Sequence, residues 1–102
     1  MATKDVLRYF GYQQITGMTT PTALTVPTKA TDGNSNVPTA TIALLQAEGA
    51  AIRWRDDGTA PTASIGMILQ LGADPYPYDG PLSAIRFIET ATGAKLNVSY
   101  YA

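Results

Sequence analysis

Apolar residues in the second half of this chain recur at every second position, and this spacing limits the possible folds more than any other feature. A period of two places alternate side chains on opposite faces of a β-strand, whereas a helix requires apolar residues three or four positions apart. The pattern occurs in residues 52–55, 65–71, 85–88 and 96–101. Successive segments of this kind predict an all-β domain.

The alternation also predicts which side chains face the core. Ile52 and Trp54 are expected to point inward, with Arg53 and Arg55 on the opposite face of the same strand. Ile68 interrupts the polar face of its strand, so that strand is expected to be covered on both sides. The remaining predicted inward residues are Ile65, Met67, Leu69, Leu71, Ile85, Phe87, Leu96, Val98 and Tyr100.

Turn-forming residues separate these segments. An Asp-Gly step lies in residues 56–62, a Pro-rich loop is expected over 72–81, and a short turn is expected over 91–94. Strands at this spacing indicate a β-sandwich or jelly roll of about seven to eight antiparallel strands. The whole chain, residues 1–102, is predicted to form this single domain.

Residues 41–48 allow two interpretations. Their Ala, Leu, Gln and Glu are good helix formers, and Gly49 is a natural helix stop. The segment is short and its neighbours are strands, so we favour a strand near residues 41–45, followed by a turn at 46–49.

The N-terminal part of the chain has a different composition. Residues 16–41 are rich in Thr, Ala and Pro, and only Leu24 and Val26 resemble the core of a strand. Pro21 and Pro27 bound that short stretch, and Pro is tolerated mainly at the edge of a sheet. Residues 16–41 are therefore predicted to be an extended arm or an edge segment.

The composition argues against most catalytic designs. The chain has no Cys and no His, which excludes disulfides, Cys-ligated zinc and His-dependent catalytic triads. Seven basic and eight acidic residues give a formal charge of -1, so no clustered cations are available for nucleic acid. No apolar run reaches the roughly 20 residues of a membrane span. We expect no catalytic residues, no cofactor, no metal, and neither a nucleic-acid nor a membrane partner.

Four acidic residues of the loops are candidates for a catalytic or calcium site. Asp56, Asp57, Asp74 and Asp79 suit acid–base chemistry or calcium, but turn formation by Asp explains them better.

Four residues are predicted as candidate partner contacts. Tyr76 and Tyr78 lie in the Pro-rich loop, as loop anchors or as contacts to a partner. Arg53 and Arg55 suit an acidic partner surface, although such residues more often bond loop carbonyls or nearby Asp.

Three stretches of the second half carry a resemblance: residues 46–62 with Gly66 and Met67, residues 82–88, and residues 94–101. Together they resemble a family of small structural proteins of tailed-bacteriophage virions, over residues 41–101. The order is a strand, an Arg-rich strand, an Asp-Gly-Thr-x-Pro-Thr turn and a Tyr-Tyr end. No part of residues 1–40 contributes to the resemblance.

This resemblance implies a jelly-roll or sandwich fold and no enzymatic activity. It also implies a capsid decoration or cement protein that binds the major capsid protein or other virion proteins. Such a chain is made in the bacterial host cytoplasm and resides in the virion. A domain of this length buries an adequate but not generous core, so a homo-oligomer is expected as well.

Two other functions remain open from the sequence. A phage-borne carbohydrate- or receptor-binding module predicts Tyr76 and Tyr78 exposed around a groove. An enzyme predicts a pocket with at least two convergent polar groups.

Overall fold

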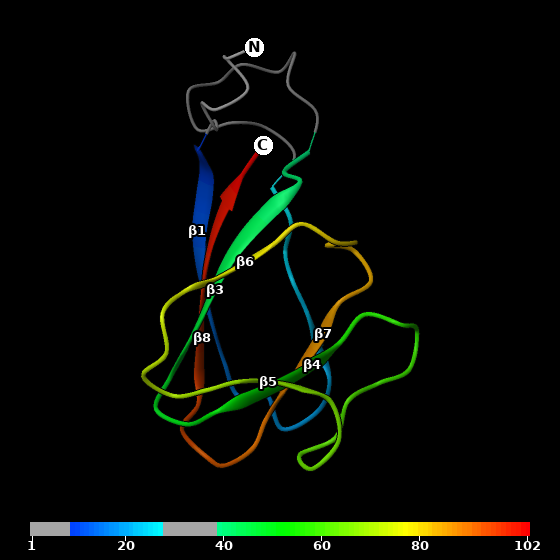
Figure 1. The fold of residues 1–102 in the computed structure, drawn as a ribbon, viewed down its shortest axis with the longest axis vertical. Helices are drawn as coiled ribbons and strands as arrows, with labels where there is room; N and C mark the ends of the chain where they lie inside the picture. The colour runs from blue at the N-terminus through cyan, green and yellow to red at the C-terminus, as the bar shows by residue number, and fades with distance from the viewer. Residues whose placement is uncertain (1–8, 28–38) are drawn as a thin grey trace.

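A computed structural model describes residues 9–27 and 39–102, which form eight β-strands and, within those ranges, no helix (Figure 1). Sheet A has the strand order β1-β8-β3-β6, and sheet B has the order β2-β7-β4-β5. The strands are β1 (Tyr9–Thr16), β2 (Thr22–Ala23), β3 (Ile42–Glu48), β4 (Ile52–Arg55), β5 (Met67–Leu69), β6 (Tyr76–Tyr78), β7 (Arg86–Glu89) and β8 (Lys95–Tyr101). The prediction of an all-β sandwich is confirmed.

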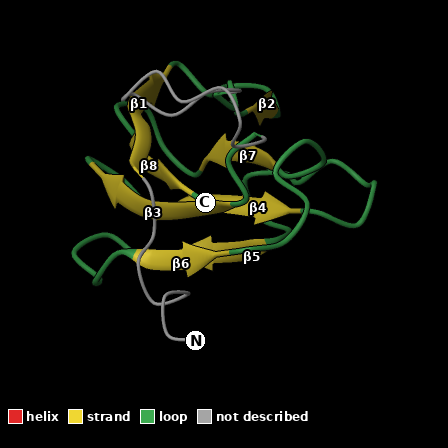
Figure 2. Ribbon diagram, turned by 90° about the horizontal axis from the view of Figure 1, so that it is seen from above, coloured by secondary structure: helices red, strands yellow, loops and turns green. Residues whose placement is uncertain are grey.

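The strand pairing follows a simple rule that identifies the topology. β4 pairs with β5, β3 with β6, β2 with β7 and β1 with β8, all antiparallel. The chain is therefore one long hairpin whose paired arms pass alternately into the two sheets, which is the arrangement of an eight-stranded jelly roll. Figure 2 shows the consequence: β5 and β6 lie along one side of the sandwich, and β1 and β2 lie along the other.

The core lies between the two sheets and follows the predicted alternation in three strands. Ile52 and Trp54 of β4 are buried, and the residues that alternate with them, Arg53 and Arg55, are not. The inward positions of β7 and β8 are also as predicted, and Ile85 just before β7 is fully buried. The largest fully buried side chains are Tyr100, Phe87, Met18, Leu45, Ile52, Ile85, Leu96, Val98 and Pro61.

The segment at residues 65–71 differs from the prediction. Only Met67–Leu69 form a strand, and of the four residues predicted inward only Leu69 is buried. Ile65, Met67 and Leu71 are each more than half exposed, and Ile68 is also exposed, so this strand is not covered on both sides. The reason is its position, because β5 is the edge strand of sheet B.

Two other segments settle the local alternatives. Residues 42–48 form the strand β3, which confirms the strand interpretation over the helix, and the strand extends to Glu48. The turn therefore begins at Gly49, later than predicted. Within the Pro-rich loop, Tyr76–Tyr78 form the edge strand β6, so the expectation of an unbroken loop over residues 72–81 is wrong.

The described part of residues 16–41 contains an edge strand. β2 pairs with β7 at the margin of sheet B, through Thr22 opposite Phe87. Leu24 and Val26 lie just beyond β2 and are half-buried against the core. Residues 28–38, the centre of the predicted arm, lie outside the described residues.

Candidate functional site

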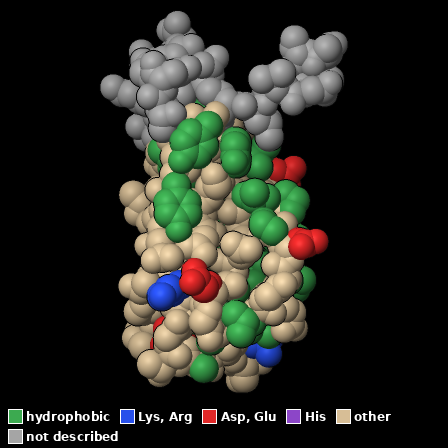
Figure 3. Space-filling view, turned by 90° about the vertical axis from the view of Figure 1, so that its left-hand side faces the viewer, with side chains coloured by type: hydrophobic (Ala, Val, Ile, Leu, Met, Phe, Trp, Pro, Cys, Tyr) green, Lys and Arg blue, Asp and Glu red, His purple; other side chains and the backbone are tan. Residues whose placement is uncertain are grey.

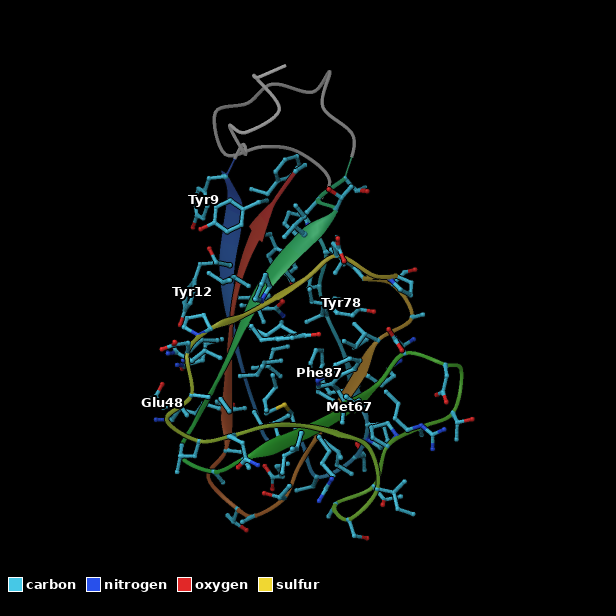
Figure 4. All side chains as sticks on the ribbon, viewed as in Figure 1. Tyr9, Tyr12, Glu48, Met67, Tyr78 and Phe87 are labelled. Carbon is cyan, nitrogen blue, oxygen red and sulfur yellow. The ribbon has the colours of Figure 1, made fainter. Side chains whose placement is uncertain are left out.

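Three aromatic side chains join the two sheets near the β5–β6 side. The indole of Trp54 in β4 lies 5.5 Å from the ring of Tyr78 and 6.2 Å from the ring of Tyr76, both in β6. Trp54 and Tyr78 are only 8% and 5% exposed, whereas Tyr76 is 44% exposed. Figure 4 shows Tyr78 and Phe87 lying between the sheets. The cluster is part of the core, with Tyr76 at its solvent margin.

The Tyr78 hydroxyl has a structural partner inside the molecule. It donates a hydrogen bond of 2.6 Å to Oδ2 of Asp56, in the turn that follows β4. Burial, and then the bond to Asp56, raise the pKa of Tyr78 above its ordinary value. Tyr78 therefore anchors the turn to the core, and its burial removes it from the surface available to a partner.

Both candidate arginines bond to this chain itself. Arg53 donates from Nη1 to the carbonyl of Gly66 at 2.8 Å and from Nε to the carbonyl of Ala63 at 3.2 Å. Arg55 forms a two-pronged ion pair with the carboxylate of Asp57, and its hydrogen bonds lower the pKa of that carboxyl. These contacts hold the β4–β5 connection in place. They explain both arginines without an acidic partner.

The acidic residues do not assemble a metal site among the residues that the structure describes. Within residues 9–27 and 39–102, no three His, Cys, Asp or Glu side chains lie close enough together to hold a metal ion. In the same ranges, no helix is long and apolar enough to cross a membrane.

A broad surface that the sequence does not single out lies on the outer face of sheet A. We call it the tyrosine face. Alternation along β8 buries Leu96, Val98 and Tyr100, and it therefore points the residues between them outward. The strand register then places side chains of β1 and β3 beside those outward residues. The tyrosine face consists of Tyr9, Tyr12, Gln14, Ile42, Leu44, Asn97, Ser99 and Tyr101.

The upper part of this face is aromatic and apolar. Tyr9 and Tyr101 are directly opposite in the register, and their rings meet edge to face at 5.9 Å. Figure 3 looks onto this side of the molecule, where hydrophobic side chains gather on the upper part. Figure 4 places Tyr9, Tyr12 and Glu48 along the same outer side. The charged residues of these three strands are Lys95 and Glu48, which lie opposite each other at the other end of the strand register.

Hydrogen bonds fix the middle of the tyrosine face. The Tyr12 hydroxyl and Nε2 of Gln14 both donate to Oδ1 of Asn97, at 2.6 Å and 2.9 Å. Nδ2 of Asn97 in turn donates to Oε1 of Glu48 at 3.1 Å. Tyr12 is therefore held across β1 and β8 although its side chain is exposed. A surface fixed in this way loses little side-chain freedom when it binds a partner.

Two hollows on the surface are lined mainly by uncharged groups. One of about 420 Å³ adjoins Tyr12 and is lined by Phe10, Gly11, Tyr12, Gln13, Thr25, Pro27 and Tyr100. Behind it, the buried Tyr100 hydroxyl donates to Oε1 of Gln13 at 2.6 Å. A second hollow, of about 520 Å³, lies near Leu82, and Asp79 is the one ionisable residue in its lining.

Comparisons with known proteins add no relative. A scan against protein-family models finds no match, and no curated protein and no solved structure is found to match this chain.

Sequence reasoning missed the tyrosine face for a specific reason. Tyr9 and Tyr12 are separated from Asn97 and Tyr101 by most of the chain, and only the β1–β8 pairing brings them together. The sequence does show that Asn97 and Tyr101 alternate with the apolar residues of the last strand and are therefore expected to point outward.

Proposed function

We propose that this chain is a non-enzymatic structural protein of a tailed-bacteriophage virion, and specifically a capsid decoration protein. The observation that carries the proposal is the tyrosine face. Protein interfaces are enriched in Tyr and depleted of charge at their centre, and this face has both properties. The resemblance over residues 41–101 supports the same conclusion. The partner is the major capsid protein or another virion protein.

The physical role follows from where such a protein binds. A chain that binds the assembled shell and not its separated subunits stabilises the shell by mass action. The jelly-roll fold is compatible with this role, because viral capsid domains use the same architecture. Fold alone does not establish function, so the role has to be tested on particles.

The test is cosedimentation of the purified protein with phage heads that lack it. The wild-type protein should pellet with the heads, and Tyr12→Ala should reduce the bound fraction because a central aromatic contact is lost. Thr92→Ala changes an exposed residue in the turn between β7 and β8, outside the tyrosine face and away from β5 and β6, and serves as the control. If the wild-type protein stays in the supernatant at every head concentration, the decoration role is refuted.

A second function is favoured by one feature of the same face. Exposed Tyr rings beside fixed amide and carboxylate groups suit a carbohydrate, whose apolar ring faces stack and whose hydroxyls form hydrogen bonds. Tyr12, Asn97 and Glu48 provide these groups, and Tyr12 also lines the 420 Å³ hollow. A carbohydrate- or receptor-binding module is therefore the alternative, now centred on Tyr12 in place of Tyr76 and Tyr78.

The two functions give different results with the same variants. A glycan array should show specific binding by the wild-type protein and loss of it with Asn97→Ala if the module binds carbohydrate. A decoration protein gives no glycan signal at millimolar ligand and pellets with heads. Melting curves of each variant establish that it is folded before binding is compared.

A further inference from the structure

The β5–β6 side of the sandwich exposes an unusual amount of apolar surface. Of the seven large hydrophobic side chains that are exposed among residues 9–27 and 39–102, five lie on or next to these two edge strands. Their exposed fractions range from 39% for Ile68 to 61% for Met67. We call this set the apolar edge: Ile65, Met67, Ile68, Leu71 and Tyr76.

The apolar edge lies where both sheets end on the same side. β5 is the last strand of sheet B and β6 the last strand of sheet A, and Figure 2 shows them along one side of the molecule. Met67 is opposite the buried Trp54, and Tyr76 is opposite the buried Leu45. Met67 and Tyr76 thus occupy inward positions that no further strand covers within the described residues.

β5 is short, with three residues, but it has no other feature that prevents an edge strand from pairing. Besides short length, edge strands are protected by charged side chains, Pro or bulges. Residues 58–73 contain no charged side chain, and the β4–β5 register shows no irregularity. β6 differs, because Pro77 has no N–H to donate at its centre. Of these two edges, β5 is the one suited to accept another strand.

We infer that two copies of this chain associate through antiparallel pairing of β5 with β5. The two copies would be related by a two-fold axis, so each copy would contribute the same residues to the interface. Sheet B of one copy would continue into sheet B of the other. The apolar edge of each copy would pack against that of its partner.

A second copy fits this edge for two physical reasons. Since residues 58–73 carry no charge, self-association brings no like charges together along the strand. The area is also appropriate, because the exposed parts of the five side chains amount to on the order of 500 Å² per copy, or about 1,000 Å² for the pair, close to the smallest specific interfaces. Association in the micromolar range or weaker is expected from so small an area.

The pairing explains why sequence and structure disagree at residues 65–71. The alternation there is that of a buried strand, while a single copy leaves Ile65, Met67 and Leu71 in solvent. In the dimer these side chains are covered. The tyrosine face lies on the other sheet and stays accessible, so a dimer presents two such faces and gains from multivalent binding to a repeating surface. The inference is independent of the proposed function, because it concerns the free protein.

The first test measures the mass of the free protein by sedimentation across a concentration series. The wild-type protein should pass from monomer to dimer. Ile68→Lys and Ile65→Lys should each weaken the dimer by roughly tenfold or more, because the two-fold axis would bring two like charges close together across the strand pair. Tyr12→Lys makes the same kind of change on the tyrosine face and should leave the dimer unchanged. Near-ultraviolet circular dichroism confirms that every variant is folded.

The second test uses the absence of Cys from the chain. In an antiparallel pair, directly opposite Cα atoms lie about 4.5–5.5 Å apart, within the range that a disulfide spans. A two-fold axis places only the residue at the axis opposite its own copy. Whichever of Met67→Cys and Ile68→Cys lies nearer that axis should therefore cross-link two copies under mild oxidation, and faster than Tyr12→Cys.

Three results would overturn the inference. The first is a wild-type protein that stays monomeric up to millimolar concentration, which would assign the apolar edge to a different protein. The second is a dimer weakened as much by Tyr12→Lys as by Ile68→Lys. The third is a failure of both cysteine variants to cross-link faster than the control. A monomeric protein can still pellet with phage heads, so cosedimentation tests the decoration role separately.

Discussion

At the scale of single residues, two glycines in different turns hold one end of the sandwich together. Gly49 follows β3 with a φ of 84°, a left-handed conformation that side chains disfavour. A Cβ built there would lie 2.2 Å from the carbonyl oxygen of Gly93, in the turn between β7 and β8. The two turns are therefore in direct backbone contact, and only Gly satisfies position 49.

This contact predicts unequal effects of two similar substitutions. Gly72→Ala meets an equivalent φ of 82° with nothing within 4 Å, so it should cost about 1–2 kcal/mol from backbone strain alone. Gly49→Ala should cost roughly 3 kcal/mol or more, because two turns must separate as well. Urea unfolding of both variants gives the difference. Equal losses of stability would show that the turns are not in contact.

The hydroxyl of Tyr78 makes a second residue-scale prediction. Tyr78→Phe keeps the buried ring and removes the bond to Asp56, so unfolding free energy should fall by about 1–2 kcal/mol. Tyr76→Phe removes a hydroxyl from an exposed ring and should change stability by less than about 0.5 kcal/mol. Chemical denaturation measures both. Matching effects from the two variants would argue against an anchoring role for Tyr78.

At the scale of elements, aromatic contacts between β4 and β6 join the two sheets. Trp54 of β4 contacts both Tyr76 and Tyr78 of β6, and the residues on either side of it, Arg53 and Arg55, bond outward to the β4–β5 connection. One four-residue strand therefore contributes to the core with one face and positions a loop with the other.

Truncation of the indole should weaken this junction between the sheets. Trp54→Ala is expected to cost about 3–5 kcal/mol, because it removes a large buried side chain and leaves a cavity. Trp54→Phe retains an aromatic contact and should cost less. Thermal and urea unfolding test the order of the two variants. A Trp54→Ala variant as stable as the wild-type protein would show that the indole is not part of the core.

At the scale of the whole molecule, stability is expected to depend on packing more than on charge. Charged residues make up 15% of the chain, and among the described residues the ion pair between Arg55 and Asp57 is exposed. Exposed pairs of this kind contribute little. The ionisable groups that matter more are two buried tyrosines, Tyr78 and Tyr100, which have to stay neutral in the folded state.

Their burial predicts the response of the protein to alkaline pH. Burial raises the pKa of Tyr100 from 10.0 to about 12 and also raises the pKa of Tyr78. Because the folded state holds these protons more tightly, their contribution to stability is complete below pH 10 and is lost as pH rises toward 12. Urea unfolding between these pH values should show the decline.

A double variant separates this effect from general alkaline damage. Tyr78→Phe with Tyr100→Phe is less stable at neutral pH, but its stability should fall less steeply above pH 10. The absorbance of tyrosinate should likewise show fewer tyrosine side chains that ionise only when the protein unfolds. An unchanged slope in the double variant would mean that other groups control the alkaline transition.

The sequence by itself determined the β-sandwich class, the inward faces of β4, β7 and β8, and the place of Trp54 in the core. These properties depend on local alternation and turn chemistry, which neighbouring residues encode. The pairing of β1 with β8, the tyrosine face and the exposed edge at β5 were decided only by the tertiary structure. Each depends on which distant strands lie side by side, and alternation marks the buried face of a strand without showing whether another strand covers it.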